Sequence, residues 1–386
     1  MGNRLLLLSC LLLTGCNYSA ISTLTPMVLP TSTIIATASS IPIASPSPSL
    51  TRVPRPTSPI TVDNVSAVRL LVSRQNGEFA SSQPPLDSQV VFTPDGRIIG
   101  VASRDGVYLY TADSLDNVRY IKTMDEIITL AFSPDGEILA TGSIFHTLDL
   151  ENNTLQLWRV SDGTLLKTID NQDSLIQSIA FSPDGRFLAS GGMPDDGLYI
   201  GVRIWQVADS SLARTLKGFG KTGGLIQSIS FSPDSQILAG GASDGVVRLW
   251  RASTGEGIGI LDGKTAPIDS MVGINTVEAF SPDGNAIALA ANYDILLRRV
   301  SDGNLLRILK GHLDCLSSLT FSPDGQLLAS ASSDHTVRLW QVSDGSLLRT
   351  LDSFTQAVNS VDFSPDGRTL AMGSADGTVQ LWGVFP

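Results

Sequence analysis

The stretch Phe321-Ser-Pro-Asp-Gly325 occurs, with small changes, seven times along the chain. Counted from one initial phenylalanine to the next, the copies are 40, 49, 50, 49, 41 and 42 residues apart. The initial phenylalanines are Phe92, Phe132, Phe181, Phe231, Phe280, Phe321 and Phe363. A sequence repeated at this spacing is typical of an array in which each unit buries its apolar face only by packing on its neighbours.

A single repeat, taken around the sixth copy, predicts four short antiparallel strands. Residues 315–321 alternate apolar and polar side chains, which is the period of a strand. Pro323-Asp324-Gly325 predicts a tight turn, because proline presets its backbone angle and glycine accepts a positive one. Apolar segments at 327–329, 336–340 and 347–351 follow, separated by Ser-Asp turns. Seven such units predict an all-β protein, a seven-bladed β-propeller of four-stranded antiparallel blades.

The order of motifs within the sixth repeat carries a resemblance. Gly311-His312, the Phe321–Gly325 phrase, Ser333-Asp334 and Val337-Arg-Leu-Trp340 follow one another. This combination resembles the WD-repeat (WD-40 type) β-propeller family, and the resemblance covers about residues 65–386. It implies a hydrogen-bond network among the histidine, a serine of the second strand, the turn aspartate and the tryptophan. Carried over, these residues are His312, Ser330 or Ser332, Asp334 and Trp340, and we interpret them as structural rather than catalytic.

Five tryptophans each end a predicted third strand, and we interpret them as packing residues. They are Trp158, Trp205, Trp250, Trp340 and Trp382. Tyr110 takes this place in the first repeat and Arg298 in the fifth. A charge in a packing position is costly unless it is paired, so the fifth blade is either loosened or holds a paired Arg298.

The seventh repeat stops after its third strand, at Trp382. Residues 65–72, Val-Ser-Ala-Val-Arg-Leu-Leu-Val, resemble the fourth strands of other repeats. We therefore predict that this N-terminal segment completes the seventh blade and closes the ring, which would remove an exposed sheet edge.

The first residues have the pattern of a secretory signal. Arg4 precedes an apolar run at 5–13, which is too short to span a bilayer. The ending Leu13-Thr14-Gly15-Cys16 resembles the bacterial lipobox, which implies cleavage before Cys16 and a lipid on that cysteine. Of the 44 residues at 17–60, 24 are Ser, Thr or Pro, a composition that predicts a disordered tether. The expected organisation is a lipoprotein signal at 1–15, a lipidated tether at 16–60 and the propeller at 61–386.

Composition argues against several classes of function. The formal net charge is −11, which disfavours nucleic acid or an anionic lipid surface as a partner. The chain has three histidines, and none has a spacing suited to zinc. No nucleophile with a base and no carboxylate pair can be nominated, so we predict a protein that is not an enzyme and uses no cofactor or metal. We expect a monomeric domain.

The repeats differ in length at four connections. The extra residues fall at 143–153, 192–201, 217–224 and 262–273, all of which lie on one face of a four-stranded propeller. Insertions on one face commonly mark a binding face. The candidate binding residues are Phe145, His146, Asp149, Asp195, Asp196, Tyr199, Phe219 and Lys221.

Aromatic side chains beside acids suit a protein or peptide partner. The sequence therefore predicts a scaffold in the bacterial cell envelope, anchored to a membrane by lipid and facing outside the cytoplasm. Stacking of glycans on the same aromatic residues is an alternative, and a propeller hydrolase is a weaker one. The loops could also be solvated segments without a ligand.

Overall fold

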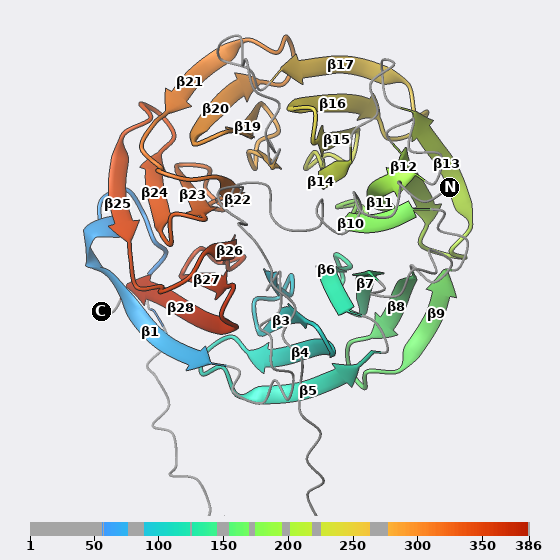
Figure 1. Ribbon diagram of the computed structural model, residues 1–386, viewed down its shortest axis with the longest axis horizontal. Coiled ribbons are helices and arrows are strands. Elements are labelled where there is room, and N and C mark those ends of the chain that lie inside the picture. The colour runs from blue at the N-terminus through green and yellow to red at the C-terminus, as the bar shows by residue number, and fades with distance from the viewer. Residues whose placement is uncertain are drawn as a thin grey trace, which may run out of the picture.

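The computed structural model describes residues 56, 58–75, 89–123, 126–144, 154–169, 174–194, 201–217, 225–262 and 277–384. The strands of this part form seven four-stranded antiparallel sheets, arranged as blades around a common axis (Figure 1). The predicted fold class, a seven-bladed β-propeller, is confirmed. In each blade the strands follow one another from the ring axis to the rim.

Blades one to four are regular in strand order. Blade one holds β2 (Val90–Phe92), β3 (Ile98–Ser103), β4 (Gly106–Thr111) and β5 (Asn117–Lys122). Blade two holds β6 (Glu126–Phe132), β7 (Ile138–Ile144), β8 (Leu155–Arg159) and β9 (Leu165–Ile169). Blade three holds β10 (Ser174–Phe181), β11 (Phe187–Pro194), β12 (Gly201–Gln206) and β13 (Leu212–Lys217). Blade four holds β14 (Ile226–Phe231), β15 (Ile237–Ala242), β16 (Val246–Arg251) and β17 (Gly257–Asp262).

The last three blades include the one that joins the two ends of the ring. Blade five holds β18 (Glu278–Phe280), β19 (Ala286–Ala291), β20 (Asp294–Arg299) and β21 (Leu305–Leu309). Blade six holds β22 (Leu316–Phe321), β23 (Leu327–Ser332), β24 (Val337–Gln341) and β25 (Leu347–Leu351). Blade seven holds β26 (Val358–Phe363), β27 (Thr369–Ser374), β28 (Thr378–Val384) and, as its outer strand, β1 (Val68–Gln75).

The repeated phrase forms the turn between the first two strands of each blade. In blade two the Ser133 hydroxyl donates to Asp135 at 2.5 Å, and the Gly136 N–H donates to the Ser133 carbonyl at 2.8 Å. Gly136 has a φ of +73°, which glycine adopts without strain. Blade four has Ser235 at this place, with a φ of +62°. Its hydroxyl accepts the N–H of Asp184 from blade three at 3.0 Å, so this serine links two neighbouring turns.

The five tryptophans lie in the core, as predicted, with at most 9% of each exposed. Their indole N–H groups also find partners. Trp205 donates to Ser190 at 3.0 Å, and Trp382 donates to the side chain of Gln380 at 2.9 Å. Buried indoles with a satisfied N–H contribute both apolar area and a fixed side-chain orientation to each blade.

Blade five departs from the pattern at the tryptophan position. Arg298 lies opposite Ile287 in the β19–β20 register and is half-buried. Its guanidinium donates to the carbonyl of Gly303 at 2.9 Å, across the next turn. Of the two sequence-based interpretations, the structure therefore shows the one in which Arg298 is paired.

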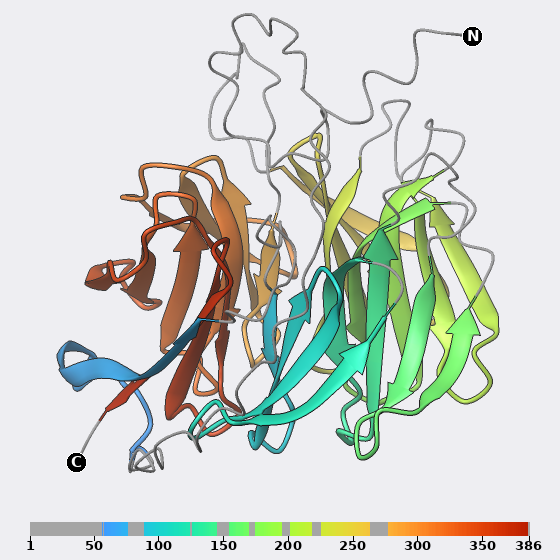
Figure 2. The same ribbon diagram turned by 60° about the horizontal axis from the view of Figure 1, so that its bottom comes forward.

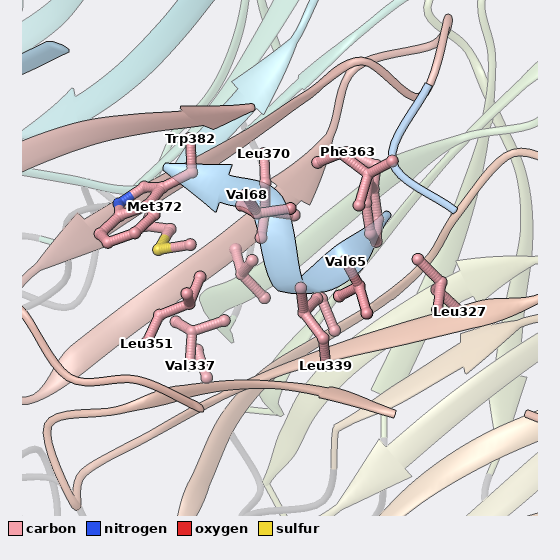
Figure 3. Packing of buried hydrophobic residues seen from close by; sticks show 14 of the residues in the cluster. Val65, Val68, Leu327, Val337, Leu339, Leu351, Phe363, Leu370, Met372 and Trp382 are labelled. Carbon is pink, nitrogen blue, oxygen red and sulfur yellow. The ribbon is translucent and has the colours of Figure 1, made fainter. Parts of the chain in front are cut away.

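The N-terminal segment closes the ring, as predicted. β1 pairs antiparallel with β28, with Leu70 opposite Trp382 and Ser73 opposite Gln380. The strand covers 68–75 and therefore starts three residues later than the predicted 65–72. Residues 65–67 form a short 3-10 helix, η1 (Val65–Ala67), whose Val65 is buried in the same core cluster as side chains from blades six and seven (Figure 3).

The inner strands are also joined from blade to blade. A polar side chain on the inner strand of one blade accepts a backbone N–H from the inner strand of the next blade. Gln89 accepts from Leu130 at 2.7 Å, and Ser178 accepts from Ile229 at 3.0 Å. The same contact closes the circle, because Ser360 of blade seven accepts the N–H of Val90 in blade one at 3.1 Å.

Candidate functional site

The antiparallel order of each blade separates two faces. The first-to-second and third-to-fourth strand connections are tight turns on one face, which we call the plain face. The second-to-third connections and the links between blades lie on the other face, which we call the elaborated face. Four longer connections were expected from the repeat lengths, and the strand ends that flank them all lie on the elaborated face: β7–β8, β11–β12, β13–β14 and β17–β18.

A fifth long connection joins the end of β1 to the start of β2, and these two strand ends lie on the same face. Sequence reasoning missed it, because lengths were compared only from the first repeated phenylalanine onward. The signal was nevertheless present as the span between residues 72 and 90.

The predicted binding residues lie in these connections and outside the described residues. They are Phe145, His146, Asp149, Asp195, Asp196, Tyr199, Phe219 and Lys221. Their role therefore remains a prediction, to which the structure adds the placement of the strands that flank them.

The described part of the elaborated face carries exposed apolar residues that sequence reasoning did not select. Tyr293, in the β19–β20 turn, is 48% exposed, and Leu313, before β22, is 80% exposed. An ion pair between Lys310 and Asp294, at 3.7 Å, joins the two segments that carry them. One signal in the sequence was available for Tyr293. Several other repeats have an aspartate at the corresponding position of the turn between the second and third strands.

Blade six brings the four predicted network residues together. His312 contacts Asp334 through Nδ1 at 2.8 Å and Ser330 through Nε2 at 2.7 Å. The Trp340 indole N–H donates to the same Ser330 oxygen at 2.8 Å. Of the two serines that the sequence offered for the network, Ser330 is therefore the member. The Ser332 hydroxyl instead donates to the carbonyl of Asp314.

Asp334 is held in its ionised form. Burial alone would raise the pKa of Asp334, but hydrogen bonds from His312, Thr336 and the backbone N–H of Leu313 outweigh it and keep that pKa below its ordinary value. The carboxylate thus orients the imidazole and connects the loop before β22 to the β23–β24 turn.

The Asp334–His312–Ser330 arrangement has the connectivity of a hydrolytic triad, but its surroundings differ. The Ser330 side chain is fully buried, and His312 is 5% exposed. A nucleophile must reach a substrate carbonyl, so this serine cannot act as one without opening the blade. The geometry supports a structural role for the network.

Other blades replace the histidine with different partners. In blade four Arg248, 3% exposed, pairs with Asp244 at 2.6 Å. In blade seven Thr355 donates to Asp376 at 3.2 Å. The turn aspartate is therefore held in these blades too, by an arginine in one and a hydroxyl in the other.

Replacing Ser330 with alanine is expected to destabilise the protein by about 2–4 kcal/mol. The change leaves the buried indole N–H of Trp340 and one nitrogen of His312 without a partner, and each such group costs about 1–3 kcal/mol. Ser190→Ala in blade three is the matched control, because among the described residues the Ser190 hydroxyl is hydrogen-bonded only to the Trp205 indole N–H. Urea unfolding of both variants measures the difference, and equal losses would contradict the network's role.

Among the described residues, no group of three or more His, Cys, Asp or Glu side chains could hold a metal ion. No helix in that part of the chain has the length and apolarity needed to cross a membrane.

Cys315, just before β22, is buried and disulfide-bonded, and the other cysteine of the disulfide lies outside the described residues.

A family model described as WD domain, G-beta repeat, matches residues 119–159, 163–198, 210–251, 303–341 and 345–383. The chain belongs to the WD40 family. Four of the five matches run from the outer strand of one blade through the first three strands of the next, and the match at 163–198 ends before β12. The stretch 252–302 has no match, and it contains most of blade five, with Arg298 in place of tryptophan.

Similar curated proteins match over short parts only. An uncharacterized WD repeat-containing protein of Synechocystis sp. is 44% identical over 61 residues, 16% of this chain and 18% of that protein. The human intraflagellar transport protein 122 homolog is 44% identical over 59 residues, 15% of this chain and 5% of that protein. The human WD repeat and SOCS box-containing protein 1 is 33% identical over 100 residues, 25% of this chain and 22% of that protein. The chain thus covers less than a quarter of each relative.

Proposed function

We propose that the protein is a lipid-anchored WD-repeat scaffold outside the cytoplasm, which binds a protein or peptide through its elaborated face. The observation that carries the proposal is the difference between the two faces of the closed ring. The strand ends joined by every connection that departs from the repeat length lie on one face, while the connections on the other face are tight turns. Loops on one side of a rigid ring are a common way to build a binding surface without changing the scaffold.

Binding is tested with the soluble chain starting at Pro56 as bait against solubilised envelope proteins. The variant Phe145→Ala/Tyr199→Ala/Phe219→Ala is expected to lose at least tenfold in affinity for the captured partner. The control removes three exposed leucines from the rim, Leu166→Ala/Leu212→Ala/Leu347→Ala, and should bind normally. Loss in the control with retention in the first variant would move the site to the rim. Capture of glycans but no protein on an array would favour the glycan-binding alternative.

The anchor is tested separately, by the mass and location of the mature protein. We expect a chain that begins at a lipidated Cys16 and sediments with membranes, and Cys16→Ser should release it to the soluble fraction. A thioether on Cys16 leaves no thiol for a disulfide. A mature protein in which an unmodified Cys16 is bonded to Cys315 would therefore contradict the lipid anchor.

A further inference from the structure

Residues 56 and 58–67, just ahead of β1, are packed against the propeller, and we call them the strap. Pro56 is buried, and Ile60 is 1% exposed. The Ile60 N–H donates to the carbonyl of Gly367 at 2.8 Å. Because Gly367 belongs to the repeated turn of blade seven, this contact places the strap at the edge of the plain face.

The strap has its own internal hydrogen bonds. The Thr61 N–H donates to the side-chain oxygen of Asn64 at 2.8 Å, and the Asn64 amide donates to the carbonyl of Pro59 at 2.9 Å. This asparagine folds the segment back on itself between the plain face and η1, so the strap has a defined course.

Close contacts hold both ends of the strap. A Cβ added at Gly383 would lie 2.7 Å from Pro56, so glycine is needed there for the proline to approach β28. At the other end, the Arg349 guanidinium of β25 donates to the carbonyls of Val65, at 2.9 Å, and Ser66. The strap therefore fastens blade six to blade seven in addition to leading into β1. In Figure 2 it rises from the lower edge of the molecule, on the side where β28 ends.

We propose that the strap fixes the point where the membrane tether leaves the propeller, so that the anchored protein holds its plain face toward the bilayer and its elaborated face away. This inference rests on the lipid anchor proposed above. Pro56 follows Cys16 by 40 residues, which as a flexible coil would span about 35 Å. A six-residue strand measures about 20 Å, which approximates the distance between the two faces of the propeller. If the elaborated face were turned toward the bilayer, the tether would have to span this distance, more than half of its end-to-end length, before it reached the membrane. The reversed orientation thus leaves the tether fewer conformations.

The negative charge of the plain face indicates that the protein is held at the membrane by its tether and not by direct binding of this face to anionic lipid. The turn aspartates Asp135, Asp234 and Asp283 have pKa values below the ordinary range, because each accepts a hydrogen bond from the serine two residues earlier. They are therefore ionised at neutral pH and oppose direct adsorption of the plain face on anionic lipid, so the proposed orientation depends on the tether and not on attraction between this face and the bilayer. We expect the propeller without its tether to show no affinity for anionic vesicles.

Energy transfer to a dye in the lipid headgroups tests the orientation. The chain from residue 17, with an N-terminal histidine tag and Cys315→Ser, is attached to vesicles containing a nickel-chelating lipid. A donor dye is placed by Leu313→Cys on the elaborated face or by Ser343→Cys on the plain face. Both positions belong to blade six and are exposed, so they differ mainly in the face on which they lie.

Transfer is expected to be at least twofold more efficient from position 343 than from position 313. Loosening the strap with Ile60→Ser/Arg349→Ala should reduce the difference. Equal transfer, or stronger transfer from position 313, would overturn the proposal. Because the tag replaces the natural lipid, a failure of lipidation at Cys16 would leave this result unaffected and would count against the anchor alone.

Discussion

Replacing Val68 with aspartate is expected to destabilise the propeller by about 3–5 kcal/mol, the largest effect of any single change considered. Val68 is fully buried at the start of β1, within the cluster that joins blades six and seven (Figure 3). An unpaired charge at this position must either be buried at high cost or force β1 away from β28. The release of β1 would expose the edge of β28 and the apolar side chains behind it.

The matched control is Leu70→Asp, two residues further along the same strand. Leu70 is 40% exposed, so its replacement should cost no more than about 0.5 kcal/mol. Thermal and urea unfolding of both variants, with light scattering to detect association, measures the effect. Complete deletion of residues 56–75 should give a chain that aggregates. A monomeric deletion variant with unchanged melting would show that β1 does not close the ring.

Replacing Glu278 with leucine is expected to stabilise the protein, and the gain should grow with pH. Glu278 is 4% exposed on the inner strand of blade five, in a position where blade six has Leu319. Neither carboxyl oxygen has a hydrogen-bond partner of normal geometry among the described residues. Burial raises the pKa of Glu278 to about 8, and the nearby Ser228 side chain and Gly241 backbone only partly oppose the shift.

The sign of the pH dependence follows from that raised pKa. Below pH 4.5 the carboxyl is protonated in both the folded and unfolded states, and its ionisation has no effect on stability. Between about pH 4.5 and 8 the unfolded chain ionises while the folded chain keeps the proton, so stability falls as pH rises. The loss should be on the order of 2–4 kcal/mol between pH 5 and pH 9.

Unfolding free energies of the native protein, Glu278→Leu and Glu278→Gln over this pH range test the prediction. Burial also raises the pKa of Asp362, on β26, to about 7, so both variants should retain a smaller fall with pH. The difference between native and variant proteins therefore isolates Glu278. A difference that does not change between pH 5 and pH 9 would contradict a buried, protonated glutamate.

The sequence was sufficient to predict the fold, because each element has a local cause. The serine, aspartate and glycine of the repeated phrase make their own turn, and the tryptophans mark the third strands. The count of seven and the missing strand after Trp382 then required an N-terminal strand to close the ring. These features depend on contacts within one repeat or between identical repeats, which a periodic sequence records directly.

The sequence was less informative where contacts join unlike segments. The start of β1 was placed three residues too early, because Val65 is apolar for a different reason: it packs in η1 against blade six. The docking of Pro56 depends on Gly383, far away in the sequence, and a proline-rich composition alone indicated a tether. The pairing of Arg298 with a backbone carbonyl likewise has no local signal. The exposed Tyr293 and Leu313 lie in connections of ordinary length, so the repeat lengths carry no signal for them.

The N-terminal strand completes blade seven and so holds the ring closed. Amide hydrogen exchange of peptides covering residues 68–75, measured by mass spectrometry on the full mature chain, tests this closure most directly. If β1 is the outer strand of blade seven, these amides exchange orders of magnitude more slowly than those of an unfolded chain, and at rates similar to those of β28. Exchange of residues 68–75 at the unfolded rate, while β26–β28 stay protected, would contradict it.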